Sequence, residues 1–288
     1  MASVLSSLPT VPLAVFGSAS ALVHNLSQSD SVLRMPLPLS RRIGFVSARG
    51  GSGTSATAAY VASILATRRR NGMVLGVNAS AGPVTILSHA GLSPVAEHAP
   101  SELRANARSA SDARDGLPVT SSGLFALDLT TESVAGAQAS ARSWFESLTP
   151  ITRFFDVVAT DWGVRSWQVD LAQIAAASHV VCLVARADRY SAEEAASLVP
   201  AIRAQEDNPR VVLALVDVGK TADRADRLVA SNVDVPVVSI PFDSARGATR
   251  PIGSSTLGAR TRIAYTELAT TLMLEAQSPA TRASEVGS

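Results

Sequence analysis

The stretch Ile43-Gly-Phe-Val-Ser-Ala-Arg-Gly-Gly-Ser-Gly-Thr-Ser-Ala56 joins a short apolar run to a glycine-rich turn, and an alanine-rich segment of helical period follows. A turn of this kind between a strand and a helix directs backbone N–H groups and the positive end of the helix at one point. Its shape therefore predicts an anion site. The alternative is that residues 50–53 only make a tight connection between the two elements.

The turn keeps part of the pattern G-x-x-x-x-G-K-[ST], in which the lysine neutralises the outer phosphates of a nucleotide and the hydroxyl holds Mg²⁺. Ser55 stands at the hydroxyl position, but Ala48 replaces the first glycine and Thr54 replaces the lysine. A threonine carries no charge and does not reach the outer phosphates. The pattern is therefore incomplete at the residue that binds phosphate most directly.

Apolar runs of strand length recur from residue 41 onward, and alanine-rich stretches of helical period lie between most of them. The runs are Ile43–Ser47, Val74–Asn78, Leu124–Leu129, Phe155–Asp161, Val180–Ala185, Val211–Val216 and Val235–Ile240. The expected helices include Ala56–Arg70, Val134–Leu148, Leu171–Ala177 and Ala192–Gln205. Near-continuous apolar strands alternating with helices are typical of buried parallel sheets. We predict an α/β fold with a doubly wound, mostly parallel sheet of seven or more strands and helices on both faces.

The pattern places one domain over residues 41–276. Residues 1–40 are rich in serine and proline and form an expected N-terminal extension, with a strand-like run at Val11–Phe16. Residues 98–122 are polar and suit a surface helix followed by a loop. We expect the tail, residues 277–288, to be disordered.

The composition excludes several classes of protein. With 47% hydrophobic and 17% charged residues the 288-residue chain is not a disordered protein, and a net charge of +1 gives no general attraction to nucleic acid. The best basic cluster, Arg68-Arg-Arg70, ends a predicted helix, where cations complement the helix dipole. No apolar run is long enough for a transmembrane helix, and the N-terminus is a poor signal peptide.

The lone Cys182 excludes an intrachain disulfide and suits a reducing compartment. It lies in an apolar run, where a small buried side chain is expected rather than a reactive thiol. The histidines lack zinc-ligand spacing.

The segment Arg49-Gly-Gly-Ser-Gly-Thr-Ser55 resembles the deviant P-loop K-G-G-x-G-K-[TS] of the MinD/ParA-like ATPases. The resemblance implies a nucleotide site formed by Arg49, Gly50, Gly51, Ser52, Gly53, Thr54 and Ser55. In that family the first lysine reaches the nucleotide of the partner in a dimer. Arg49 takes its place here.

Two further strands carry the same resemblance. Met73-Val-Leu-Gly-Val-Asn-Ala-Ser80 resembles the V-L-x-V-D-A-D strand, whose acids position Mg²⁺ and water, but Asn78 and Ser80 replace both acids. Phe155-Asp-Val-Val-Ala-Thr-Asp-Trp-Gly163 resembles the Walker B strand Y-D-x-x-x-x-D-x-x-G, with the glycine one residue early. The resemblance makes Asp161 the candidate catalytic residue and, with Ser55, the candidate Mg²⁺ ligand. The alternative for Asp161 is a carboxylate that caps a strand end.

The C-terminal part, Val237-Val-Ser-Ile-Pro-Phe-Asp243 and Thr256-Leu-Gly-Ala-Arg-Thr-Arg-Ile-Ala-Tyr-Thr-Glu-Leu-Ala269, resembles the MinD-like proteins encoded with actinobacterial type VII secretion systems. The resemblance implies a catalytically degenerate, cytoplasmic scaffold or regulatory component of a membrane-associated machine, peripheral to the membrane through its partners. We expect ATP and Mg²⁺ to bind weakly or not at all, and protein partners or a homodimer rather than nucleic acid.

Three questions stay open at this level. The alternative function is a slow ATPase of the partitioning or septum-placement type, which would use Arg49, Ser55, Asp161 and backbone N–H groups. The tryptophans Trp144, Trp162 and Trp167 are candidates for a partner surface, although large aromatic residues at such a loop are more often packed than exposed. Asp217 falls where the family often has an asparagine that reads adenine, and an aspartate does not donate to the base in that way.

Overall fold

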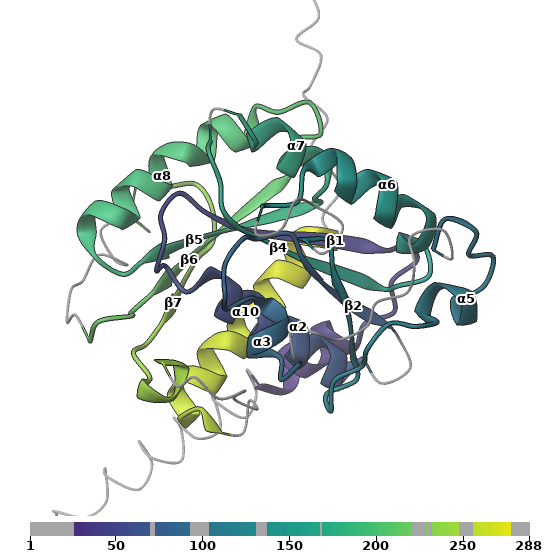
Figure 1. The fold of residues 1–288 in the computed structure, drawn as a ribbon. Coiled ribbons are helices and arrows are strands. Elements are labelled where there is room, and N and C mark those ends of the chain that lie inside the picture. The colour runs from purple at the N-terminus through teal and green to yellow at the C-terminus, as the bar shows by residue number, and fades with distance from the viewer. Residues whose placement is uncertain are drawn as a thin grey trace, which may run out of the picture.

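The computed structural model describes residues 26–69, 73–92, 104–130, 137–167, 169–220, 229, 232–247 and 256–277. Seven parallel strands form one sheet in the order β3-β2-β4-β1-β5-β6-β7 (Figure 1). The strands are β1 Arg41–Ser47, β2 Val74–Asn78, β3 Leu124–Asp128, β4 Val157–Val164, β5 Val180–Arg186, β6 Arg210–Val216 and β7 Val237–Ile240. The predicted α/β fold with a parallel sheet is confirmed.

Helices cover both faces of this sheet (Figure 1). One face carries α2 Thr54–Arg68, α3 Ile86–His89 and α10 Ala259–Gln277, and the other carries α5 Ala110–Arg114, α6 Ala141–Thr152, α7 Leu171–Ala176 and α8 Arg189–Arg203. A 3-10 helix, η2, spans Ser244–Gly247 after β7. A further helical stretch covers 26–34.

The apolar strands build two cores because their side chains alternate between the faces. On β6, Val212 and Ala214 lie in the core under α2 and α10, whereas Leu213 and Leu215 lie in the core under α8. All these positions are buried, so a central strand reads as continuously apolar. Cys182 on β5 is fully buried, and this burial raises the pKa of its thiol, in agreement with the predicted structural role.

Several helix boundaries differ from the prediction. The second predicted helix begins at Ala141 rather than at 134, because Ser140 caps it by accepting a hydrogen bond from the Ser143 backbone N–H at 3.0 Å. Asp188 starts α8 three residues earlier than expected in the same way, through the Ser191 N–H at 2.9 Å. In the polar segment 98–122, the described part contains the short helix α5. Residues 11–16, 98–103, 134–136 and 278–288 lie outside the described residues.

The described part of the N-terminal extension packs against the end of α2. Leu33 belongs to the core under α2 and α10. The buried guanidinium of Arg69 donates to the carbonyls of Leu33 and Met35 at 2.8 and 3.0 Å, and it pairs with Asp156 at 3.1 Å. Arg68 lies 2.9 Å from Asp30. Arg68 and Arg69 of the basic cluster therefore have structural partners, while Arg70 lies outside the described residues.

None of the helices in the described ranges is both long and apolar enough to cross a bilayer.

Candidate functional site

The glycine-rich turn connects β1 to α2 at the carboxyl edge of the sheet. Gly51 and Gly53 have φ angles of 74° and 80°, a left-handed conformation that glycine adopts without strain. Gly53 is the N-cap of α2, offers no side-chain cap, and the first turn of the helix contains no acid. The first backbone N–H groups of α2 therefore keep their capacity for an anion.

The turn is held by its own serines. The hydroxyls of Ser47 and Ser52 donate to the carbonyl oxygen of Arg49 at 3.1 and 2.8 Å. Thr54 begins α2 and is only 6% exposed. The position of the phosphate-binding lysine is thus a buried, uncharged side chain, and the turn offers backbone groups instead of a fixed cation.

Arg49, which is expected to contact a nucleotide, is bound to α8 of the same chain. Its guanidinium forms a two-pronged ion pair with the Glu194 carboxylate, with a distance of 3.0 Å from Nη2 to Oε1. The same Nη2 donates to the Tyr190 hydroxyl at 2.8 Å, and Cζ lies 4.7 Å from the centre of the Tyr190 ring. Planar guanidinium is well suited to this combination of fork and stacking. Arg49 therefore has a partner within its own chain.

Releasing Arg49 should strengthen anion binding at the turn. We expect Glu194→Gln to raise the affinity for ATP about two- to fivefold, because an exposed ion pair of this kind contributes little and the neutral glutamine no longer repels phosphate. Calorimetry with Mg²⁺–ATP measures the change. The matched control is Glu193→Gln, because Glu193 pairs with Arg189 at 2.7 Å. Equal affinities for the two variants would contradict the role given to Glu194.

Asp161 lies at a bulge in β4. The register between β1 and β4 shifts by one residue directly after Asp161, and Trp162 is the extra residue, packed in the core beside Trp144. Gly163 follows with φ 66°, and a Cβ atom there would lie 2.6 Å from Cβ of Ser80. The close approach of Ser80 requires a glycine at this place, one residue earlier than in the resembling pattern.

The carboxylate of Asp161 is fully buried and accepts several hydrogen bonds. The Gly163 N–H donates to Oδ1 at 3.0 Å, while the Ile86 N–H and the Ser80 hydroxyl approach Oδ2 at 3.3 Å. Burial raises the pKa of Asp161, and a hydrogen bond from Ser55 is the largest of the contacts that oppose the rise. The structure thus brings together the two candidate Mg²⁺ ligands, Ser55 and Asp161, and their metal binding stays a prediction.

Asn78 and Ser80 close a polar network beside Asp161. The Asn78 amide donates to Oδ1 of Asp128 at 2.9 Å, and its carbonyl oxygen accepts from the Ser80 hydroxyl at 2.9 Å. Asp128 also accepts from the Thr130 hydroxyl at 2.6 Å. Asn78, Ser80, Asp128 and Asp161 are buried at the carboxyl ends of β2, β3 and β4, and Thr130 is half-buried. Neutral side chains therefore link the two carboxylates. Within the described ranges, no cluster of three or more His, Cys, Asp or Glu is arranged to hold a metal ion.

Sequence reasoning missed the acids around the site. Asp128 ends an apolar run at the carboxyl edge of a predicted parallel strand, and this position is a usable signal for a site residue. Glu194 and Tyr190 are far from Arg49 along the chain, so no local pattern identifies their contact.

The structure removes two of the three tryptophans from the predicted partner surface. Trp144 and Trp162 are buried, because Trp144 donates to Thr160 at 3.0 Å and Trp162 fills the core at the bulge. The interpretation of these two as partner residues is wrong. Trp167 is 52% exposed and remains a candidate.

The loop after β6 carries Asp217, which the family resemblance places at the nucleotide base. Its carboxylate accepts from the Gly219 N–H at 3.1 Å, and its carbonyl oxygen accepts from Arg246 on η2. The end of β6 and the loop pass close to the turn, since a Cβ at Gly53 would meet Val216 at 3.4 Å and Val218 at 3.9 Å. Asp217 thus lies near the candidate site, and its reading of a base is untested.

Comparison with solved structures identifies the fold. The MinD cell-division ATPase of Pyrococcus furiosus superposes with a TM-score of 0.62 at 17% identity, over 83% of this chain and 100% of that chain. A ParA family ATPase from Chlorobium tepidum gives 0.60 at 18% identity, over 80% and 98%. The MinD of Pyrococcus horikoshii, solved with Mg-ADP, gives 0.62 at 16% identity, over 80% and 95%.

No protein-family model matches the chain, and no curated protein sequence matches it. At these identities the similarity shows the fold alone. The chain has the P-loop α/β fold of the MinD and ParA ATPases.

Proposed function

We propose that this chain is a catalytically degenerate protein of the MinD/ParA type, which works as a scaffold or regulatory component through protein partners. The observation that carries the proposal is the closed network at the metal position, where the neutral Asn78 and Ser80 link Asp128 to Asp161. Phosphoryl transfer depends on positioned charge and an oriented water. Thr54 supplies no charge to the outer phosphates, and the network leaves little to orient water.

The proposed setting is a membrane-associated machine, most specifically type VII secretion. Its support is the sequence likeness of the C-terminal segments, which correspond to β7, η2 and α10. In this region Asp243 accepts hydrogen bonds from the N–H groups of Ala245 and Gly258 at 3.0 and 2.8 Å. Tyr265 on α10 packs against Tyr60 on α2, with ring centres 4.9 Å apart. These contacts hold the start of α10 beside η2 and pack α10 against α2.

The proposal predicts weak or absent ATP binding. We expect calorimetry with Mg²⁺–ATP to give a Kd no tighter than about 100 μM, because the lysine and the acids that hold Mg²⁺ are missing. Phosphate release should stay at background in the same samples. Tight binding that depends on Mg²⁺ would refute a degenerate site.

One observation favours the alternative of a slow ATPase. Ser55 opposes the rise in the pKa of the nearby Asp161, and the first amides of α2 have no side-chain cap, so part of a nucleotide site is in place. Phosphate release above background that Asp161→Asn abolishes would select this alternative over the scaffold.

A further inference from the structure

A cavity of about 360 Å³ lies at the amino-terminal edge of the sheet, at the opposite end from the glycine-rich turn. Its walls are the connection 37–40 that leads into β1, the start of β1, the segment between α6 and β4, and the residue before β5. We call it the arginine cavity, after the basic residues that line it: Arg41, Arg42, Arg153 and His179.

The arginine cavity carries excess positive charge. Among the described residues that line it, Asp156 is the one acid, and Arg69, which lies outside the cavity, pairs with it at 3.1 Å. The negative charge of Asp207 favours a higher pKa for Arg42, but burial has the larger effect and lowers this pKa. Among the described residues, three arginines therefore line one cavity, and its one carboxylate is already engaged.

The guanidinium groups of the arginine cavity are only partly engaged by the protein: Arg153 Nη2 donates to the Ala107 carbonyl oxygen at 3.4 Å, and Arg42 Cζ lies 6.0 Å from the centre of the Trp144 ring. The Nε atoms of Arg41 and Arg42 are buried without an acceptor in the part of the chain that the structure describes. The Nδ1 atom of His179 accepts a hydrogen bond from the Arg42 backbone N–H at 2.9 Å. In the neutral ring the proton is consequently on Nε2, which makes His179 a donor.

The protonation state of His179 is also consistent with a positively charged cavity. Burial, and then the charges of Arg42 and Arg41, lower the pKa of His179 to about 4. Both arginines therefore act on one imidazole, which stays neutral at physiological pH. Arg153 is exposed, and its Cζ lies 4.7 Å from the centre of the Phe154 ring, where stacking orients its fork.

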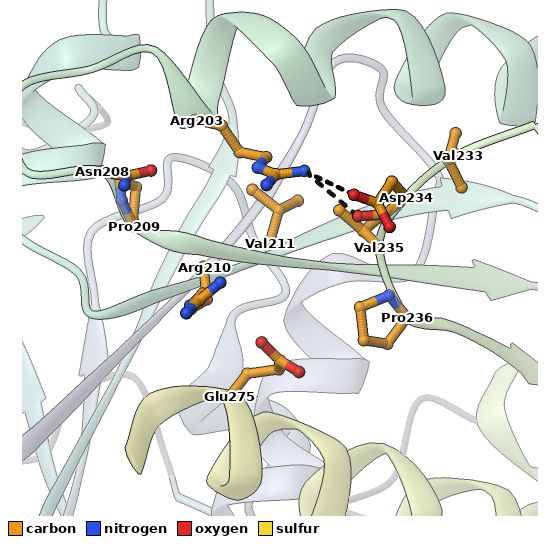
Figure 2. Close-up of a pocket in the computed structure, with 10 residues that line it drawn as sticks. All are labelled: Arg203, Asn208, Pro209, Arg210, Val211, Val233, Asp234, Val235, Pro236 and Glu275. Carbon is orange, nitrogen blue, oxygen red and sulfur yellow. Dashed lines mark hydrogen bonds and ion pairs between the residues drawn. The ribbon is translucent and has the colours of Figure 1, made fainter. Parts of the chain in front are cut away.

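A larger cavity on the same edge of the sheet shows no such excess of positive charge. It has a volume of about 580 Å³ and is lined by residues of α8, β6, the segment before β7, and α10. Figure 2 shows Arg203 linked to Asp234, and it places Glu275 of α10 on the side of β6 toward which Arg210 points. Among the described lining residues there, acids and arginines are equal in number, two of each. The excess of positive charge belongs to the arginine cavity.

We propose that the arginine cavity binds a small phosphate-bearing anion with two or more negative charges. Guanidinium groups bind phosphate oxygens through paired hydrogen bonds, and several of them around one cavity favour a multiply charged ligand over a single chloride. The site lies at the opposite end of the sheet from the glycine-rich turn, so it does not depend on the proposed loss of catalysis. It assigns a ligand to a part of the fold that the nucleotide site does not use.

Calorimetry with pyrophosphate and the full-length chain tests this proposal. We expect one saturable site, and Arg153→Met should weaken binding about tenfold or more, because it removes one charged fork. Arg42→Met should weaken binding similarly. Arg142→Met is the matched control, since Arg142 lies on the exposed side of α6 and pairs with Glu146 at 2.9 Å.

A mutation in the glycine-rich turn distinguishes the two possible anion sites. Arg49→Glu places a negative charge at the glycine-rich turn and should leave pyrophosphate affinity unchanged. Loss of affinity in Arg49→Glu, with no change in Arg153→Met, would place the anion at the turn and overturn the proposal. Absence of binding up to about 10 mM pyrophosphate would overturn it as well. Arg153 is exposed, so this variant should fold even if Arg42→Met does not.

Discussion

Thr54→Lys is expected to raise the affinity for Mg²⁺–ATP by about 1–3 kcal/mol, or roughly fivefold to 150-fold, without producing turnover. The gain follows from the place of Thr54 at the start of α2, next to the uncapped N–H groups of the turn. A lysine there adds a mobile charge to groups that already favour an anion. Calorimetry measures the affinity, and phosphate release measures turnover.

Turnover should stay at background because the other parts of the site are still missing. Asn78 and Ser80 offer no carboxylate to Mg²⁺ or to an attacking water, and Asp161 is enclosed by hydrogen bonds. Groups that act as a unit are strongly non-additive, so one restored member gives little rate. Adding Asn78→Asp and Ser80→Asp to the lysine should be the minimum for activity.

The control for Thr54→Lys is Thr67→Lys, which places the same charge on an exposed position of α2. This variant should bind ATP as the parent does. ATPase turnover in Thr54→Lys at the level of an active enzyme would show that the acids are not limiting. The interpretation of a site lost at several points would then be abandoned.

The fold could be predicted from local patterns because each buried strand is both short and apolar. Val74–Asn78 was located to the residue, since glycine, asparagine and proline flank a run in which every side chain is buried. Helix starts are harder to place from sequence, because a cap such as Ser140 or Asp188 decides them and several serines and aspartates compete for that role.

The candidate site was predictable only where its residues follow one another in the chain. The glycine-rich turn is one continuous segment, whereas Asp161 is assigned to the same site through the family resemblance alone. Ser55 lies close enough to Asp161 to oppose the rise in its pKa. The contacts that change its chemistry come from distant elements. Glu194 of α8 holds Arg49, and Asp128 of β3 accepts from Asn78, so both depend on strand order and helix placement. Spacing in the sequence does not encode either contact.

The network around Asn78 leads to a prediction about stability. Asn78→Asp should lower the free energy of unfolding by about 2–3 kcal/mol at neutral pH, because the hydrogen bond to Asp128 is replaced by repulsion between two buried carboxylates. Asn78 now donates to Asp128 across 2.9 Å, so the new charge would lie at contact distance. Chemical denaturation of the parent and the variant measures the difference.

The pH dependence of this loss has a definite sign. Repulsion raises the pKa of one carboxyl of the pair in the folded state above its value in the unfolded chain. The folded variant therefore takes up a proton as the pH falls through that raised pKa, and repulsion disappears. The destabilisation relative to the parent should be largest at neutral pH and should shrink below about pH 5. Mg²⁺ should also reduce it, since a divalent cation between the acids replaces the lost donor.

An exchange of the two side chains separates charge from packing. The double variant Asn78→Asp with Asp128→Asn restores one amide and one carboxylate with their roles reversed, so most of the lost stability should return. If Asn78→Asp were as stable as the parent at neutral pH, the carboxylates would not be in contact. If only the single variant gained stability from Mg²⁺, the position would still be able to hold the metal. The acids that hydrolysis needs would then destabilise the fold whenever no cation is bound, and Asn78 would be the residue that removes this cost.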